Sequence, residues 1–175
     1  HPTAWTLQAE RCICHTALAQ LSSYPTIAFM NTASINDHYT HDHDRLDELF
    51  HQFQTLKSAD RPNALRHYQE FNAGLEQHIV WEEELLFPSF ESKTGMVTGP
   101  TEVMRWEHRQ IRDFLNAIAE KLARDDFDTS DEESGLLAVL GPHNHKEENI
   151  LYPMIDQVTG AEERAEIFAR MNAGA

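Results

Sequence analysis

An internal repeat constrains this chain more than any other feature of its sequence. The segment HIVWEEELLFPSF, which starts at His78, has a counterpart HNHKEENILYPMI, which starts at His143, so the offset is 143 minus 78, or 65 residues. Because only 11 of the 175 residues are histidine, several coincidences at one offset exceed what chance would give. The repeat predicts two similar helical hairpins that together form a pseudo-twofold site. Within these segments the shift superimposes Glu82 on Glu147 and Pro88 on Pro153, and outside them it superimposes His43 on His108.

Apolar residues at three- and four-residue steps predict long amphipathic helices. The second helix follows a break at residues 58–62, where Asp60 or Asn63 can act as N-cap, and we expect it to end at Pro88. The third helix covers roughly residues 101–124, with a proline near its first turn. The first helix starts at about Asn36, and its apolar face consists of Leu46, Leu49, Phe50, Phe53 and Leu56.

A fourth helix carries the second copy of the repeat. It follows an acidic run, where Thr129 or Ser130 can act as N-cap, and we expect it to end near Pro153. Gly141 and Pro142 lie inside this pattern, and we expect them to kink the helix rather than to mark its start. No segment shows the alternation of apolar and polar residues that is typical of β-strands. We therefore predict an all-α fold, an antiparallel up-down four-helix bundle.

The predicted helices divide the chain into three parts. Residues 1–35 show little regular pattern, and we expect an N-terminal arm packed on the bundle. Residues 36–156 form the bundle itself, and residues 157–175 form a C-terminal helical extension. In that extension, residues 161–171 are expected to form a helix that covers the bundle or contributes to a homodimer contact.

Composition excludes some classes of partner. The chain has 29 acidic against 14 basic residues, a net charge of −15, and no Lys/Arg cluster, so we expect no nucleic acid partner. No apolar run approaches the roughly 20 residues that span a bilayer, and we expect no membrane insertion. The two cysteines, Cys12 and Cys14, are too close for an ordinary disulfide framework, which favours a reducing, cytoplasmic location. For these cysteines and His15 we expect plain packing.

The spacing within the repeat suits metal ligands. His78 and Glu82 are four residues apart, as are His143 and Glu147, so each pair projects from one helical face. Facing helices of a bundle can build sites for two metal ions, which carboxylates bridge while imidazoles take the terminal positions. Such bridged pairs favour two iron ions, with manganese or zinc as replacements. The predicted ligands are His43, His78, Glu82, His108, His143 and Glu147.

Other polar and aromatic residues near these positions have simpler interpretations. His41 and His145 lie two residues from a predicted ligand, which turns them away from the site. Glu83 and Glu148 could orient imidazoles, but solvated surface acids are the favoured interpretation. We expect surface or outer positions for His38, His51 and His67. We expect core positions for Tyr39, Trp81, Trp106 and Tyr152.

Over residues 36–156 the chain resembles the hemerythrin-like His-His-Glu cation-binding domain. The resemblance rests on four stretches. This resemblance implies a non-haem di-iron centre linked to dioxygen, nitric oxide or redox signalling. The four stretches are His43-Asp44-Arg45-Leu46, His78 through Glu82-Glu83 to Leu86-Phe87-Pro88, Trp106-Glu107-His108, and His143 through Glu147-Glu148 to Leu151-Tyr152-Pro153.

The ligand set departs from that of the oxygen-carrying members. Those proteins have a second histidine four residues after the one that corresponds to His108, where this chain has Arg112. Their last helix pairs histidine with an aspartate five residues on, whereas Glu147 follows His143 by four. The set is more similar to proteins proposed to repair iron centres. Those often carry an N-terminal module with adjacent cysteines, which Cys12-Ile13-Cys14 does not match.

Three functional hypotheses follow from the pattern. The leading one is a di-iron protein that binds dioxygen, nitric oxide or a related small ligand in sensing, scavenging or stress response. The second is an iron donor or redox enzyme, which as a repair factor would need a protein partner. The third is a bundle in which metal serves stability alone.

Overall fold

The computed structural model describes residues 33–173, which contain helices and no strand. The expected packing of residues 1–32, including Cys12, Cys14 and His15, lies outside this range. None of the described helices is both long and apolar enough to cross a membrane. The elements in chain order are α1 (Ile35–Leu56), α2 (Arg61–Trp81), η1 (Glu82–Leu86), α3 (Phe87–Thr94), α4 (Pro100–Leu122), α5 (Ser130–Lys146), η2 (Glu147–Leu151), α6 (Tyr152–Val158) and α7 (Ala161–Ala173).

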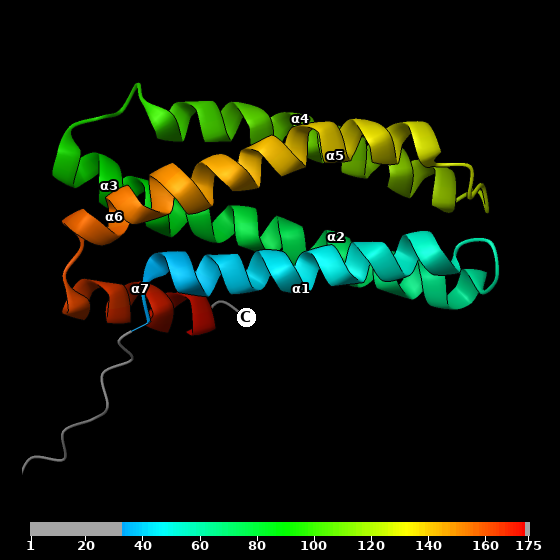
Figure 1. The fold of residues 1–175 in the computed structure, drawn as a ribbon, viewed down its shortest axis with the longest axis horizontal. Coiled ribbons are helices and arrows are strands. Elements are labelled where there is room, and N and C mark those ends of the chain that lie inside the picture. The colour runs from blue at the N-terminus through cyan, green and yellow to red at the C-terminus, as the bar shows by residue number, and fades with distance from the viewer. Residues whose placement is uncertain (1–32, 174–175) are drawn as a thin grey trace, which may run out of the picture.

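The helices form two antiparallel hairpins, as the repeat predicts. In Figure 1, α1 lies along α2, and α4 lies along α5, with the two hairpins side by side. The segments η1 and α3 continue the direction of α2, and η2 and α6 continue that of α5 (Figure 1). The predicted all-α antiparallel bundle is therefore confirmed.

Side-chain caps explain where two of the helices begin. The Ser34 hydroxyl accepts a hydrogen bond from the Asp37 amide at the start of α1. The Asp60 carboxylate accepts one from the Asn63 amide at the start of α2, which confirms one of the two predicted caps. Thr129 is the N-cap residue of α5, but its hydroxyl donates to Glu133 Oε1 at 2.5 Å instead of capping a backbone amide.

The predicted helix ends at Pro88 and Pro153 are wrong. In each case one π-helical stretch of five residues, η1 or η2, precedes the proline, and the helix then continues as α3 or α6. A proline lacks an amide hydrogen and its ring clashes with the carbonyl four residues before it, so it normally ends a helix. The wider π turn changes the hydrogen-bond register, and the chain passes the proline as the first turn of a new α-helix. Pro142, in contrast, lies within α5, so it does not mark the start of that helix, as expected.

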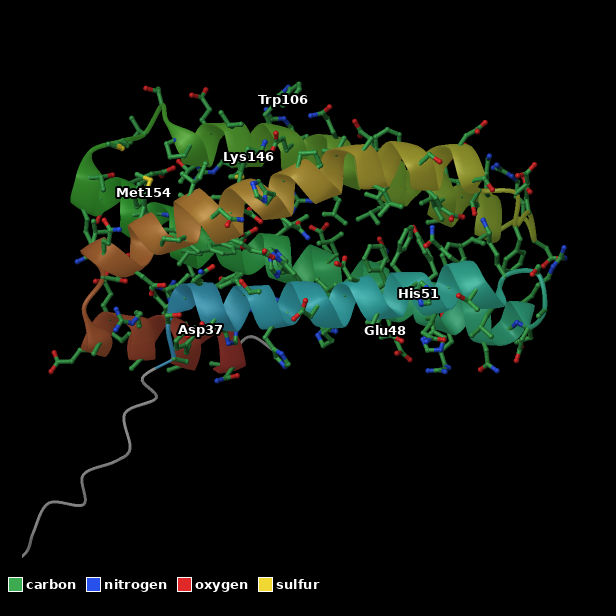
Figure 2. The ribbon with its side chains drawn as sticks, viewed as in Figure 1. Asp37, Glu48, His51, Trp106, Lys146 and Met154 are labelled. Carbon is green, nitrogen blue, oxygen red and sulfur yellow. The ribbon has the colours of Figure 1, made fainter. Side chains whose placement is uncertain are left out.

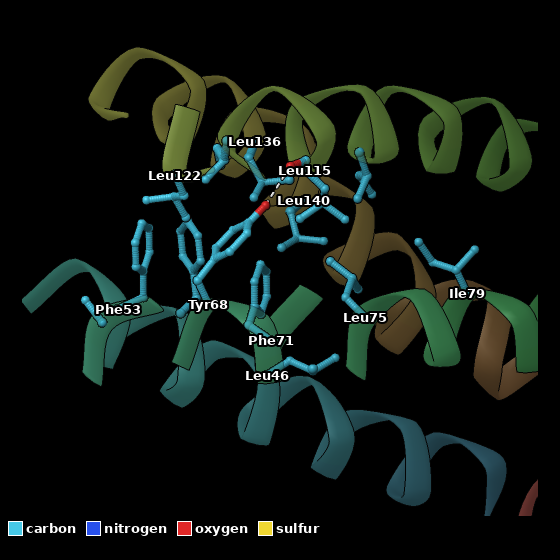
Figure 3. Packing of buried hydrophobic residues seen from close by; sticks show 14 residues of the cluster. Leu46, Phe53, Tyr68, Phe71, Leu75, Ile79, Leu115, Leu122, Leu136 and Leu140 are labelled. Atoms are coloured by element: carbon cyan, nitrogen blue, oxygen red, sulfur yellow. Dashed lines mark hydrogen bonds between the residues drawn. The ribbon is translucent and has the colours of Figure 1, made fainter. Parts of the chain in front are cut away.

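Apolar side chains fill the bundle in two separate clusters. The larger cluster lies toward the loop between α1 and α2, and Figure 3 shows its leucine and phenylalanine side chains from all four long helices. Its one polar group, the Tyr68 hydroxyl, donates to the Leu115 carbonyl oxygen at 2.6 Å (Figure 3). The second cluster lies at the opposite end and includes Ile35, Phe90 and Ile155. Between the clusters the helices present polar residues to one another.

Helix α7 covers the second cluster. Ile167, Phe168 and Met171 of α7 are buried in it, which is the covering role that the sequence predicts for this segment. Just before α7, the Asp156 carboxylate accepts hydrogen bonds from the amides of Ile35 and Asn36, at 2.8 and 3.0 Å. The end of α6 therefore fixes the start of α1 and closes this end of the bundle.

Substitution of Leu115 tests the larger cluster. Leu115 is 2% exposed, so Leu115→Ala leaves a cavity and should lower the free energy of unfolding by about 2–5 kcal/mol in a denaturant titration. The control Leu137→Ala, at a side chain that is 43% exposed, should change it by less than about 0.5 kcal/mol. Equal losses from the two variants would contradict the packing described here.

Candidate metal centre

The six side chains predicted as ligands lie together in the middle of the bundle. None is more than 4% exposed, and each comes from a different helical segment. His43 lies on α1, His78 on α2, His108 on α4 and His143 on α5. Glu82 and Glu147 are the first residues of η1 and η2, which places both carboxylates at matching π-helical turns. They occupy the polar layer between the two apolar clusters.

The ligand atoms fall into two groups in which all atoms lie within 4.8 Å of one another. One group comprises Glu82, His108, His143 and Glu147, and the other comprises His43, His78 and Glu147. Glu147 belongs to both groups. The arrangement therefore offers two neighbouring positions for a cation, with a carboxylate between them.

Each of the two carboxylates faces histidines from both halves of the repeat. Glu147 Oε1 lies 3.1 Å from His143 Nε2, while Glu147 Oε2 lies 3.5 Å from His43 Nε2. Glu82 Oε2 lies 3.2 Å from His108 Nε2 and 3.7 Å from His78 Nε2. This is the relation required of carboxylates that bridge two ions.

A second layer of carboxylates contacts the outer nitrogen, Nδ1, of each of the four histidines predicted as ligands. His43 Nδ1 lies 2.8 Å from Glu148 Oε1, and His108 Nδ1 lies 2.8 Å from Glu83 Oε1. Since an Nδ1–H that donates outward leaves Nε2 facing the centre, these contacts set both tautomer and ring orientation. The interpretation of Glu83 and Glu148 as surface acids is therefore wrong. Each reaches across to a histidine of the other hairpin, a contact that sequence spacing does not reveal.

The other two histidines use carboxylates that the sequence analysis missed. His78 Nδ1 lies 2.9 Å from Asp42, and His143 Nδ1 lies 2.9 Å from Glu107. The signal was present, because 42 plus 65 is 107, and each acid directly precedes a predicted ligand of the repeat. The four carboxylate–histidine pairs therefore obey the same pseudo-twofold relation as the ligands.

Cations on the outside neutralise three of these four carboxylates. Burial would raise the pKa of Asp42, but His78 and Arg45 outweigh it and lower this pKa to about 2. Lys146 pairs with Glu107. Arg112 lies 3.4 Å from Glu83 and 2.7 Å from Glu76, so it supports His108 indirectly and does not enter the centre. Within residues 33–173 the fourth carboxylate, Glu148, pairs with His43 and with no lysine or arginine.

Two buried tyrosines border one side of the centre. The Tyr152 hydroxyl donates to Glu82 Oε1 at 2.7 Å and lies 3.2 Å from Glu147 Oε2. Burial, together with these two carboxylates, raises the pKa of Tyr152 well above its ordinary value. Tyr39 packs against Tyr152 with ring centroids 5.0 Å apart. Both are core residues as predicted, but Tyr152 also contacts two predicted ligands.

The remaining aromatic and histidine residues lie away from the centre. Trp106 is 55% exposed on the outside of α4, so the expectation of a core position for it is wrong (Figure 2). Trp81 is partly buried beside the second cluster. His51, on the outer face of α1, is exposed (Figure 2), as are His41 and His145, whereas His38 and His67 are partly buried.

Three unsatisfied atoms show that the centre suits a cation. Glu82 Oε2, His108 Nε2 and Glu147 Oε1 are buried and make no hydrogen bond in the structure. Buried polar atoms nearly always have a partner, because leaving one unpaired costs about 1–3 kcal/mol. These three belong to one group of potential ligands and are the kinds of atom that bind iron, manganese or zinc. The residues present therefore fit a metal centre.

The histidines differ in their affinity for protons. Burial lowers the pKa of His108, but the carboxylates of Glu82 and Glu83 outweigh it and raise this pKa to about 9. Burial and the neighbouring His78 lower the pKa of His43 to about 4. In the metal-free protein at neutral pH, His108 is therefore protonated and His43 is neutral. A proton on His108 partly offsets the buried negative charge.

Comparison with known proteins gives one match. The family model described as the hemerythrin HHE cation binding domain matches residues 34–155. No curated protein and no solved structure matches the chain significantly. The match covers all six predicted ligands and the four carboxylates behind them.

The raised pKa of His108 predicts how the stability of the metal-free protein depends on pH. The pKa of His108 is about 9 in the folded protein and 6.5 in the unfolded chain, so protonation of His108 contributes its full stabilisation below pH 6.5. This contribution is lost as pH rises through 9. Urea titrations in the presence of a chelator should show a fall on the order of 1–3 kcal/mol between these values. The pKa values of His78 and His143 are also raised and act in the same direction.

Glu83→Gln provides the matched control for this pH dependence. It removes one of the charges that raise the pKa of His108, so the loss of stability above pH 6.5 should be smaller and should be complete at a lower pH than in the wild type. A flat profile for both proteins between pH 6.5 and 9 would contradict the assignment.

Proposed function

The chain belongs to the hemerythrin HHE cation-binding family, and from this premise we propose that it is a non-haem di-iron protein that binds dioxygen or nitric oxide. The observation that carries the proposal is the composition of the two ligand groups. His43, His78 and Glu147 form a set of two histidines and one carboxylate. That donor set, with its open positions, is typical of non-haem iron that reacts with oxygen.

The second group supports the choice of iron over zinc. It holds Glu82, His108, His143 and the shared Glu147. Structural zinc sites are usually closed by four donors around a single ion, whereas here a carboxylate is shared between two groups. We therefore propose two iron ions per chain, with manganese or zinc as replacements in the same donor set.

A groove on the bundle surface offers a route for a small ligand. It has a volume of about 330 Å³, lies between α1 and α5, and is lined by residues that include His43, Glu148 and Leu137. His43 is only 4% exposed, so the opening at the centre itself is narrow. A diatomic molecule suits this access far better than a bulky substrate does.

The roles of the side chains follow from their contacts. His43, His78, His108 and His143 would hold the ions as terminal ligands, and Glu82 and Glu147 would bridge them. When bound, the iron pair would supply open coordination positions and electrons for a diatomic ligand. Asp42, Glu83, Glu107 and Glu148 orient the imidazoles through their Nδ1 atoms. The two apolar clusters exclude water from both sides of the polar layer.

The biological role that we propose is sensing, scavenging or a stress response in the cytoplasm. An iron donor would need ligands that release the metal readily. Here each of the four histidines predicted as ligands is held in orientation by a carboxylate at its Nδ1 atom. Three of these carboxylates are themselves paired with Arg45, Arg112 or Lys146. Outer contacts of this kind strengthen metal binding, so they favour a retained cofactor over a donated one.

Metal content tests the ligand set. The purified chain should bind two iron ions, and His143→Ala should lower both content and affinity because it removes a buried ligand. His145→Ala, two residues along on the exposed face of α5, is the matched control and should retain both ions. An equal loss in the two variants, measured by elemental analysis, would exclude the proposed centre.

Reaction with small ligands tests the function. Under argon the reduced, iron-loaded protein should change its absorption spectrum on addition of oxygen or nitric oxide, and removal of the gas should reverse the change. The same additions to the zinc-loaded protein should have no effect, because zinc has no redox chemistry. A loaded iron protein that stays unresponsive would leave metal with a structural role alone.

A further inference from the structure

The two halves of the centre are not equivalent, although the repeat relates their ligands. Position 152 is tyrosine, while its counterpart 65 residues earlier, at 87, is phenylalanine. Phe87 stacks on His108, with ring centroids 5.9 Å apart and planes 9° from parallel. Tyr152 instead presents a hydroxyl group to the ligands. One side of the centre therefore has an additional oxygen atom that the other side lacks.

That oxygen lies on the side with fewer ligands. The group around His108 and His143 has four members, whereas the group around His43 and His78 has three. The Tyr152 oxygen lies 3.4 Å from His78 Nε2 and 3.2 Å from Glu147 Oε2. Within that group, His43 Nε2 lies 3.2 Å from His78 Nε2. The phenol oxygen thus lies within 3.4 Å of two members of the smaller group, a separation similar to that between the His43 and His78 nitrogens.

Burial and packing fix this oxygen in place. Tyr152 is 0% exposed, and its ring packs against those of Tyr39 and His43, at centroid distances of 5.0 and 6.0 Å. Its backbone amide donates to the Glu147 carbonyl across the π turn, so η2 positions the bridging carboxylate and the phenol together. No rotation of a surface side chain is needed to bring the oxygen to the centre.

We propose that Tyr152 is an additional protein ligand to the iron of the His43–His78 group, which it binds through its phenol oxygen. This rests on the proposed function, since it requires that the chain hold iron. On binding, the O–H bond of Tyr152 breaks, an oxygen–iron bond forms, and the proton leaves to bulk water. No electron is transferred in this step. Glu82 Oε1, which accepts the hydrogen bond from the Tyr152 hydroxyl, is then released and becomes available to the metal.

A phenol that only donated a hydrogen bond to Glu82 would give a different spectrum. A phenolate bound to ferric iron produces an intense visible charge-transfer band and resonance-enhanced tyrosine vibrations. A neutral, hydrogen-bonded phenol produces neither. The spectrum of the ferric protein therefore reports on ligation itself and not on catalytic activity.

The test uses the full chain loaded with ferric iron. Wild type should show the charge-transfer band with two bound ions, and ring-deuterated tyrosine should shift its Raman vibrations. Tyr152→Phe should lose the band, while Tyr39→Phe, the matched control 5.0 Å away, should keep it.

The possible outcomes separate this inference from the proposed function. Two bound iron ions without the band in wild type, or a band that survives in Tyr152→Phe, would overturn the role of Tyr152 and leave the di-iron proposal intact. Failure of wild type to bind iron would overturn both. If Tyr152→Phe does not fold, the isotope shift in wild type together with the band of Tyr39→Phe still decides the assignment.

Discussion

The structure depends on the burial of two carboxylates, Glu82 and Glu147, at 0% exposure in the middle of a four-helix bundle. An unpaired buried charge costs several kcal/mol, and these two glutamates lie close together between two apolar clusters. In the metal-free protein, protons on the histidines offset part of this charge. Burial would raise the pKa of Glu147, but the neighbouring His143, His78 and His108 lower it. Protons and metal ions therefore compete for the same nitrogen atoms.

This constraint explains the layers of charge around the centre. Each histidine lies between an inner glutamate and an outer carboxylate, and most of the outer carboxylates lie against a lysine or an arginine. Around His78, His108 and His143 the charges thus alternate from the centre to the surface, which places each ionised group there next to a partner. The exception is Glu148 at the groove, where the pattern ends without a cation among the described residues. That part of the groove therefore carries negative charge that no lysine or arginine among the described residues offsets.

The sequence predicted the features that follow from periodicity and repetition. Helical spacing of apolar residues gave the bundle, and the 65-residue repeat brought together six side chains that the structure places in one layer. The helix ends at Pro88 and Pro153 could not be predicted, because a π turn is a tertiary accommodation that has no periodic pattern. The contacts of Glu83 and Glu148 cross between hairpins, so they depend on how the helices pack. Asp42 and Glu107 were within reach of sequence analysis, because the same repeat relates them.

The asymmetry between Phe87 and Tyr152 shows how a duplicated site can acquire two distinct halves. Each side chain follows a buried glutamate, Glu82 or Glu147, by five residues, across equivalent π turns. One packs on an imidazole, and the other adds a hydroxyl group beside the smaller ligand group. A single oxygen atom thus differentiates two positions that the backbone makes nearly equivalent.

Anomalous diffraction from crystals of the iron-loaded protein, collected at the iron absorption edge, tests the central claim most directly. The account predicts two peaks in the polar layer, one beside His43 and His78 and one beside His108 and His143, with Glu147 between them. A single peak, or peaks bound to exposed residues outside the bundle, would contradict it.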